Sequence, residues 1–328
     1  MTDKQMNVRR AGKPNGKTNG IRPIMLAIAG DSGTGKTTIT AGLVAALGED
    51  RITSVGADDY HKYDREERKE LPFTPLHPDC NYIDIMEQHL QNLAMGEPIL
   101  KPIYNHDTGK LERPEYVEPR EFVIVEGLLP LHTDLARACF DVSVYMDPPE
   151  EIRIAWKLSR DTKKRGYTED EVRADLKKRE PESVEFIRPQ RSRADIVVRF
   201  APIEERGETA DDALSATLLL RPTIDHPDLH NILGDHTNEA MHLKLSRDDD
   251  GKPVDAVHIH SYGDPKVTKN VEQAVWDRLG VEAPVPESLG QLDSDHRDEP
   301  LALTQLMLLY HLIQAEERMK KAASDSGS

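Results

Sequence analysis

Residues 24–38 read IMLAIAGDSGTGKTT, and this stretch decides the fold. An apolar run stops at Gly30, small residues follow, and Lys36 and two threonines close the stretch. The segment from Gly30 to Thr37 fits the pattern G-x-x-x-x-G-K-[ST] at every position. Glycines let such a loop curl so that successive N–H groups point at phosphate oxygens, and the following helix adds its positive N-terminal end. The stretch therefore predicts a buried strand, a phosphate-binding loop and a helix.

The same motif predicts that the chain binds a nucleoside triphosphate together with Mg²⁺. In such loops the lysine, here Lys36, reaches the β- and γ-phosphates, and the hydroxyl of the next residue, here Thr37, coordinates Mg²⁺. The residues expected to contact the nucleotide are Gly30, Asp31, Ser32, Gly33, Thr34, Gly35, Lys36, Thr37 and Thr38.

Strand-like and helix-like segments alternate from residue 24 to about residue 200. The expected strands are 24–30, 52–58, 121–127, 141–147 and 194–200. The expected helices are 36–47, 82–95, 149–164 and 168–179. The central strands are nearly continuous apolar runs, as is typical when helices cover both faces of a parallel sheet. The pattern predicts an α/β fold of the P-loop NTPase type, with a doubly wound, mostly parallel sheet and helices on both faces.

The texture of the sequence changes after about residue 203. An acidic linker over 203–212 precedes an alternating stretch, 240–262, which is divided by a DDDG turn and predicts a β-hairpin. Two helices are expected to follow, over 267–279 and 301–321. We therefore expect four parts: a disordered tail (1–22), a P-loop kinase domain (23–202), a smaller C-terminal α+β extension (203–322) and a second disordered tail (323–328).

Composition narrows the class of protein. The net charge of −16 argues against a nucleic-acid partner, because nucleic-acid-binding domains are basic. No apolar run approaches the ~20 residues needed to span a bilayer, so no membrane segment is expected. Two cysteines, Cys80 and Cys139, provide no disulfide framework and favour the reducing cytoplasm. Six histidines crowd the C-terminal extension and are expected at its surface: His226, His230, His236, His242, His258 and His260.

Two further groups of carboxylates follow predicted strands. Glu126 ends the strand over 121–127, so it is expected beside the phosphate loop, where it can share the Mg²⁺ shell with Thr37. Asp58 and Asp59 lie at the carboxyl end of the strand over 52–58, and a carboxylate near the γ-phosphate can accept a proton from an attacking hydroxyl. These carboxylates predict a catalytic edge of the sheet; a strand-end carboxylate that faces water is the alternative for Glu126.

Cations lie close to these aspartates in the sequence and suit an anionic substrate. They are His61, Arg65, Arg68 and Lys69. A solvated helix face is the alternative explanation of this charge run. Farther along, Arg160 and Arg165 flank a helix end before Gly166. Planar guanidinium groups bind phosphate through two hydrogen bonds, so these two arginines suit a lid over the nucleotide.

Six segments occur in order that together resemble the phosphoribulokinase/uridine kinase family. They are GDSGTGKTT (30–38), DDYHKYDREERKE (58–70), KPIYNHDTG (101–109), VIVEGLLPL (123–131), YMDPPEEIRIAWKLSRDTKKRG (145–166) and PQRSRADIVV (189–198). Within the family they are most similar to the phosphoribulokinase branch. The hairpin and last helix resemble, more weakly, the long form of that branch in plants, cyanobacteria and some archaea.

The resemblance implies an activity and a set of residues that perform it. The activity is ATP-dependent phosphorylation of ribulose 5-phosphate at its 1-hydroxyl, which gives ribulose 1,5-bisphosphate and ADP, by a homodimer. Asp58 matches the catalytic base and Glu126 the second acidic residue. The matched substrate contacts are His61, Arg65, Tyr104, His106 and Lys157. Arg160, Asp161 and Arg165 match the segment that closes over the nucleotide and the transferring phosphoryl group.

The sequence departs from the family pattern at three positions. Thr34 replaces the phosphate-loop cysteine of thiol-regulated enzymes, and Gly56 lies where their second regulatory cysteine would align. Leu129 stands where the family usually has a histidine, which leaves the acceptor open. The alternatives are a uridine or other sugar-phosphate kinase of the same family, and a non-catalytic nucleotide-binding switch protein.

Overall fold

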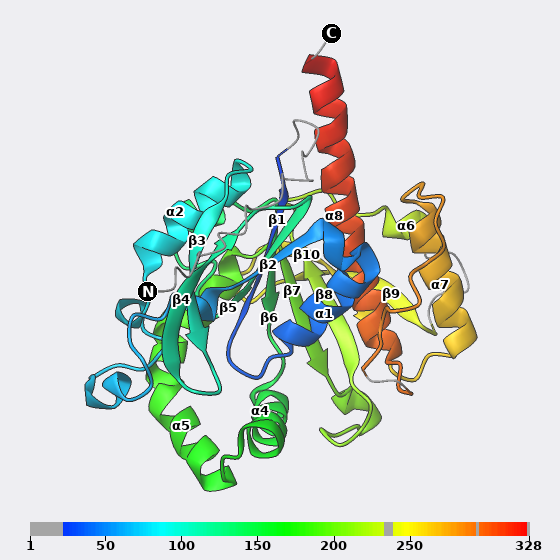
Figure 1. Cartoon of the computed structure of the whole chain (residues 1–328). Coiled ribbons are helices and arrows are strands. Elements are labelled where there is room, and N and C mark those ends of the chain that lie inside the picture. The colour runs from blue at the N-terminus through cyan, green and yellow to red at the C-terminus, as the bar shows by residue number, and fades with distance from the viewer. Residues whose placement is uncertain (1–21, 233–238, 293–294, 327–328) are drawn as a thin grey trace, which may run out of the picture.

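The computed structural model describes residues 22–232, 239–292 and 295–326, which build one eight-stranded sheet with helices on both faces (Figure 1). Five adjacent strands are parallel, in the order β2 (Ile52–Gly56), β5 (Phe122–Gly127), β1 (Ile24–Gly30), β6 (Val142–Met146) and β7 (Ile196–Ala201). Their buried, apolar residues explain why they occupy the centre of a parallel sheet. The predicted fold class is confirmed.

The C-terminal part of the chain extends this same sheet. Three antiparallel strands continue it beyond β7, in the order β8 (Ser215–Leu220), β10 (Pro253–Ile259) and β9 (Met241–Arg247). β9 and β10 form the hairpin predicted over 240–262, whereas β8 was not predicted. The boundary expected at residue 203 falls in the connection between β7 and β8, two neighbouring strands of one sheet.

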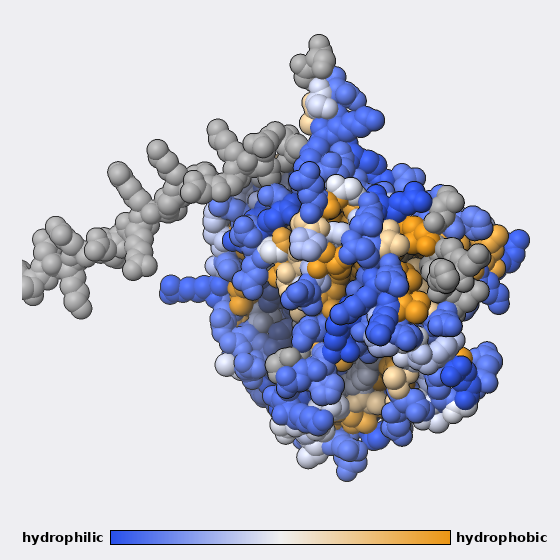
Figure 2. Space-filling view, turned by 90° about the vertical axis from the view of Figure 1, so that its right-hand side faces the viewer, coloured by the Kyte–Doolittle hydropathy of each residue, from blue (hydrophilic) through white to orange (hydrophobic). Residues whose placement is uncertain are grey.

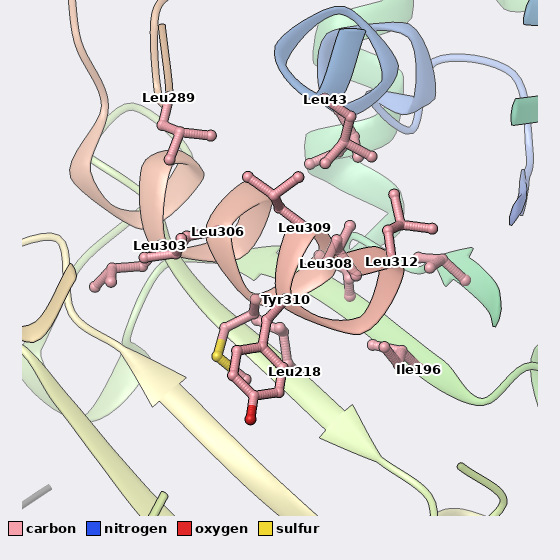
Figure 3. Packing of buried hydrophobic residues seen from close by; sticks show 14 of the residues in the cluster. Leu43, Ile196, Leu218, Leu289, Leu303, Leu306, Leu308, Leu309, Tyr310 and Leu312 are labelled. Atoms are coloured by element: carbon pink, nitrogen blue, oxygen red, sulfur yellow. The ribbon is translucent and has the colours of Figure 1, made fainter. Parts of the chain in front are cut away.

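Helices cover the two faces of the sheet through separate apolar clusters. On one face, α1 (Lys36–Leu47), α7 (Pro265–Asp277) and α8 (Glu299–Ser326) enclose the larger cluster. Figure 3 shows Leu43 of α1 beside α8, with Leu308 of α8 above the strands that carry Ile196 and Leu218. On the other face, α2 (Ile83–Ala94) packs against β1, β2 and β5. The strands β1, β2 and β5 are therefore covered by apolar side chains on both faces.

Helix α8 lies against α1 because a glycine leaves room for it. A Cβ atom on Gly42 would overlap the side-chain amide of Gln305. That amide donates to the backbone oxygen of Thr38 (3.1 Å) and accepts from the backbone N–H of Gly290 (2.8 Å), and Gln305 is fully buried. The C-terminal helix is thereby tied to the helix that begins at the phosphate loop.

The remaining elements lie around the sheet. They are β3 (Ile99–Asn105), β4 (Lys110–Val117), α3 (Asp134–Arg137), α4 (Glu150–Arg165), α5 (Glu169–Glu182) and α6 (Leu229–Ile232), together with short 3-10 turns and a π-helical turn over Ser183–Ile187. The two-stranded sheet of β3 and β4 was not predicted. In Figure 1, α4 and α5 lie below the sheet.

Two predictions about the chain ends meet different outcomes. The disordered tail expected over 1–22 lies almost entirely outside the described residues. The tail expected over 323–328 is wrong as far as residue 326, because α8 continues to Ser326; the last two residues lie outside the described range. No helix in the described part of the chain is long and apolar enough to cross a membrane.

The surface placement expected for the histidines of the extension is wrong for His260, which is buried. His242 stacks against both His258 and His260, and its Nδ1 lies 2.8 Å from Nε2 of His260. His226 is hydrogen-bonded to the buried His311 of α8. Of the other members of the group, His230 is exposed and His236 lies outside the described residues. These rings pack and hydrogen-bond because β9, β10 and α8 bring together residues that are distant in the sequence.

Candidate active site

The carboxyl ends of three neighbouring strands bring the predicted site residues together. β5 lies between β1 and β2, so the phosphate loop after β1, Glu126 near the end of β5 and Asp58 after β2 meet at one edge of the sheet. A cleft of about 1500 Å³ opens at this edge. Of the predicted residues, those that line it are Ser32, Gly33, Thr34, Gly35, Lys36, Thr37, Thr38, Asp58, His61, Arg65, Tyr104, His106, Glu126, Lys157, Arg160, Asp161 and Arg165.

The phosphate loop packs directly on α4. Gly33 has a φ of 89°, in the left-handed region, and a Cβ atom there would lie only 2.8 Å from Cβ of Lys157. Nζ of Lys36 donates to the backbone oxygens of Gly30 (2.8 Å) and Asp31 (2.7 Å). Burial lowers the pKa of Lys36, while the nearby carboxylates of Asp58 and Glu126 act to raise it. The loop therefore presents a lysine held in place at its centre.

Gly30 and Asp31 belong to the loop but do not line the cleft. The carboxylate of Asp31 turns away from it: one oxygen accepts from the backbone N–H of Ser32 (2.6 Å) and the other from the hydroxyl of Ser183. Arg153 of α4 lies 3.5 Å from the same carboxylate. The side chain of Asp31 thus fastens the loop to α4 and to the π-helical turn.

Two hydroxyl groups of α1 contact a carboxylate near the end of β5. The hydroxyl of Thr37 donates to Oε1 of Glu126 (3.3 Å), and the hydroxyl of Thr40 donates to Oε2 (2.7 Å). Mg²⁺ prefers oxygen ligands and is commonly held by one or two carboxylates together with substrate phosphates. The donor set of Thr37 and Glu126 therefore fits Mg²⁺. Within the described residues there is no cluster of three or more His, Cys, Asp or Glu side chains that would hold a metal alone.

The two aspartates after β2 have different surroundings. Asp59 pairs with the buried amine of Lys101 and accepts from the backbone N–H of Tyr104 (3.1 Å). Oδ1 of Asp58 accepts a hydrogen bond from the backbone N–H of Leu128 (3.3 Å), and its carboxylate lines the cleft. Both aspartates line the cleft, but among the described residues only Asp59 is paired with a cation, which leaves the Asp58 carboxylate open to a substrate.

His61 is a buried, neutral ring at the floor of the cleft. The amide nitrogen of Asn81 donates to the backbone oxygens of Pro75 (3.0 Å) and His77 (2.9 Å), so the amide oxygen faces His61. Nδ1 of His61 donates to that oxygen (2.6 Å). Burial lowers the pKa of His61 to about 4, and the Asp58 carboxylate offsets this only in part. The neutral ring therefore carries its proton on Nδ1, which leaves Nε2 as a hydrogen-bond acceptor.

Two arginines and an aromatic ring form the wall beyond His61. Arg65 donates to the backbone oxygens of His106 and Asp107, and its guanidinium thereby braces the turn between β3 and β4. Arg68 lies over the ring of Tyr104, with Cζ 4.7 Å from the ring centroid, and donates to the Tyr104 hydroxyl. Nη1 of Arg68 is buried and has no hydrogen-bond partner among the described residues. Arg68 lines the cleft; the sequence suggests it as one of four cations suited to an anionic substrate, although it is not among the residues matched to the family's substrate contacts.

The other side of the cleft is formed by α4. Lys157 is buried and donates to Asp161 (2.8 Å), which also accepts from Nε of Arg160 (2.8 Å) and lies 3.5 Å from Arg165. Burial acts to raise the pKa of Asp161, but the hydrogen bonds from Arg160 and Lys157 outweigh it and lower the pKa to about 2. Arg160 also reaches the Ser32 hydroxyl of the phosphate loop (3.2 Å). Asp161 therefore orients the cations of α4.

The C-terminal extension lines one end of the cleft, which the sequence did not predict. The ring of Trp156 lies over Gly35, 3.4 Å from the place of a Cβ atom there, and is tilted against Phe200 at 6.4 Å between centroids. Beyond these rings the lining residues are Ala210, Asp212, Ala213, Leu214, Leu292, Asp298 and Leu301. No local signal marks them, because the segments that lead into β8 and α8 reach this end of the cleft only in the folded chain.

The chain belongs to the Phosphoribulokinase / Uridine kinase family, which it matches over residues 25–206. It is 41% identical over 181 residues to phosphoribulokinase from Synechocystis, an alignment that covers 55% of this chain and 54% of the relative. It is 34% identical over 185 residues to uridine kinase from Oceanobacillus iheyensis, with coverage of 54% and 86%. The chain thus matches about half the length of that phosphoribulokinase.

A solved structure extends the fold comparison to the C-terminal part. Phosphoribulokinase from Rhodobacter spheroides superimposes with a TM-score of 0.55 and 17% sequence identity, over 79% of this chain and 97% of that one. At this level of identity the likeness concerns the fold. It confirms the class of fold that the phosphate-loop stretch predicts.

Proposed function

We propose that this protein transfers the γ-phosphoryl group of ATP to the 1-hydroxyl of ribulose 5-phosphate, giving ribulose 1,5-bisphosphate and ADP. The observation that carries the proposal is the cleft in which Asp58 lies between the phosphate loop and a wall of cations. Phosphoryl transfer needs a triphosphate site, an acceptor site and a proton acceptor between them. The likeness to a cyanobacterial phosphoribulokinase favours this acceptor.

The proposed mechanism assigns a task to each part of the cleft. Asp58 accepts the proton of the attacking hydroxyl, while Lys36, Arg160 and Arg165 stabilise the negative charge of the transferring group. When bound, Mg²⁺ at Thr37 and Glu126 would screen the charge of the β- and γ-phosphates. Catalysis then rests on position and electrostatics, as is general for this chemistry.

The acceptor's own phosphate is proposed to bind beyond His61. Arg65 and the unpartnered nitrogen of Arg68 supply the positive charge there, while Nε2 of His61 accepts a hydrogen bond from a sugar hydroxyl. Tyr104 and His106 shape this wall through edge-to-face ring contacts. Lys157, predicted as a substrate contact, has its amine in a buried pair with Asp161, and we assign it to holding the carboxylate that orients Arg160 and Arg165.

Two other functions fit parts of the cleft, and one experiment distinguishes them from the proposed activity. A kinase for uridine or another sugar phosphate is favoured by the 86% coverage of a uridine kinase and by Leu129, which is buried where the family usually has a histidine. A non-catalytic nucleotide switch would need no acceptor site. The test is incubation with ATP, Mg²⁺ and a panel of ribulose 5-phosphate, ribose 5-phosphate and uridine, with ADP release followed. Turnover confined to ribulose 5-phosphate supports the proposal; preference for uridine, or no turnover with any acceptor, refutes it.

We further propose a cytoplasmic homodimer. β9 is the last strand of the sheet in the described part of the chain, and Leu245 on it is 80% exposed. The side of the molecule that bears β9 and α7 displays hydrophobic residues among hydrophilic ones (Figure 2). An open strand edge of this kind is a template for pairing with a second copy. Sedimentation velocity measures whether the protein is a dimer in solution. The variant Leu245→Lys is expected to shift the equilibrium from dimer toward monomer.

A further inference from the structure

A partly buried ion-pair network joins the tip of the β9–β10 hairpin to the carboxyl end of β6. Asp248, at the hairpin turn, is only 5% exposed. Its Oδ1 accepts from Nη1 of Arg191 (2.7 Å), and its Oδ2 accepts from Nη2 of Arg221. Nε of Arg191 in turn donates to Oδ2 of Asp147 (2.7 Å). One arginine thus holds two carboxylates that are about a hundred residues apart in the sequence.

Asp147 is the residue on which α4 turns. It follows β6 directly, and its backbone N–H donates to Val198 of β7 (2.8 Å), so its main chain is fixed to the sheet. Pro148 and Pro149 follow, and α4 begins at Glu150. Because proline holds φ near −65°, this connection has little freedom of its own. The direction in which α4 starts therefore depends on how Asp147 is held, and Arg199 lies 4.0 Å from the same carboxylate. Farther along, Arg153 and Lys157 hold the helix against the phosphate loop.

Arg160 and Arg165 lie on the later turns of α4, away from Asp147, so a small change in the direction of the helix would move them the most. Arg160 lies ten residues after Glu150, or about 15 Å along a helix, so a tilt of about 5° at Asp147 would move it by about 1 Å. Misplacement of a reacting or stabilising group by that amount can cost on the order of a hundredfold in rate. Small changes at the hairpin tip can therefore be amplified at the cleft.

The stability of the fold does not by itself explain why four charged side chains form this network. Replacement of buried ion pairs by apolar residues is often neutral or stabilising, so a network of this kind is weak evidence for stability. Arg221 closes it from the other side, since its Nη1 donates to the backbone oxygens of Arg191 (2.7 Å) and Ala194. None of Asp147, Arg191, Arg221 and Asp248 is among the described residues that line the cleft.

We propose that Asp248 is a positioning residue, which acts through Arg191 and Asp147 to set the direction of α4 and thereby the places of Arg160 and Arg165. The hairpin of the extension, outside the residues matched to the family, would thus tune the kinase core. The inference rests on the proposed phosphoryl transfer only for its effect on rate.

The kinetic test compares Asp248→Asn with Asp249→Asn. Asp249 is the matched control, because it lies 3.4 Å from the same arginine but its side chain is 88% exposed. Asp248→Asn is expected to lower kcat about five- to fiftyfold, with the KM for ATP within about twofold, because the phosphate loop itself is unchanged. Asp249→Asn is expected to keep kcat within about twofold of the wild type. Arg191→Lys, which keeps the charge but not the forked contact, is expected to act like Asp248→Asn and serves if that variant does not fold.

A double-mutant cycle separates positioning from loss of stability. If Asp248 acts through Asp147, the variant Asp147→Asn/Asp248→Asn loses no more kcat than the worse single variant. Independent, multiplying losses in kcat would overturn the inference. A structural role alone would lower the denaturant midpoint of Asp248→Asn while leaving its kcat, measured below the unfolding transition, at the wild-type value.

A spectroscopic readout makes the test independent of the acceptor. The chain has two tryptophans, so Trp276→Phe leaves Trp156 of α4 as the single emitter, next to Gly35 of the phosphate loop. On titration with ATP, Asp248→Asn is expected to reduce the change in Trp156 emission at saturation, and Asp249→Asn to preserve it. An unchanged emission response together with an unchanged kcat overturns the inference. A reduced response in a protein that turns over no acceptor upholds the inference while refuting the proposed function.

Discussion

The contact between Gly42 and Gln305 yields a prediction that runs against helix propensity. In an exposed helix, Gly→Ala stabilises by about 1 kcal/mol. Here the new methyl group would overlap the amide of Gln305, which is buried between α1 and α8. We expect Gly42→Ala to break the hydrogen bonds of that amide with Thr38 and Gly290, and to lower the free energy of unfolding.

The magnitude follows from those two hydrogen bonds. Each is worth about 0.5–1.5 kcal/mol, and a buried polar group left without a partner costs about 1–3 kcal/mol more. Against these losses stands the gain of about 1 kcal/mol from helix propensity. The expected net loss is about 1–5 kcal/mol.

Urea unfolding followed by circular dichroism measures this loss. The control is Gln305→Ala, which removes the obstacle: in that background Gly42→Ala is expected to be neutral or stabilising. If Gly42→Ala raises the stability of the otherwise unchanged protein, or costs as much in the Gln305→Ala background as it does alone, the proposed contact between α1 and α8 is refuted.

Four further predictions concern the cleft and the titratable groups. Lys36→Ala should lose most activity while its circular dichroism spectrum stays that of the wild type, because Lys36 stabilises phosphate charge; activity within about threefold of the wild type would remove the nucleotide role. Asp58→Asn should lower kcat by ~10²–10⁴-fold with little change in ATP affinity, and an unchanged kcat with weaker ATP binding would instead make Asp58 a metal ligand. Activity should be nearly equal after oxidant or dithiothreitol, since Cys80 is buried with its pKa raised to about 11, and a reversible loss abolished by Cys80→Ser or Cys139→Ser would contradict this. Burial and the neighbouring histidines lower the pKa of His260 to about 4, so the unfolded chain, whose histidines titrate near 6.5, takes up the proton first. Stability should therefore be full above about pH 6.5 and fall toward pH 4, and His260→Phe, which keeps a ring in the stack, should flatten that fall in denaturant midpoints measured at several pH values.

The phosphate loop and the covered parallel sheet could be predicted from the sequence, because both depend on residues that are close together along the chain. The spacing of Gly30, Gly35 and Lys36 specifies a phosphate loop, because the loop, the strand before it and the helix after it are contiguous. The apolar runs of the parallel strands specify a sheet covered on both faces. Since all carboxyl ends of such strands share one edge, the convergence of Asp58 and Glu126 at the phosphate loop also followed from the sequence.

The different contacts of similar, neighbouring residues could not be predicted from the sequence, because they depend on the folded chain. Asp58 and Asp59 are adjacent in the sequence, but Lys101 reaches Asp59 alone, because β3 lies on that side. Nη1 of Arg68 is buried without a hydrogen-bond partner among the described residues, next to the ring of Tyr104, which belongs to β3.

Contacts between distant segments were likewise invisible to local patterns. Asn81 fixes the position of the His61 proton, and Gln305 ties α8 to α1. Asp248 contacts Asp147, just before α4, through Arg191. Each depends on strand order, on the approach of packed helices and on the exclusion of water. A local sequence pattern carries none of these, because burial and long-range pairing arise only when the whole chain has closed around its core.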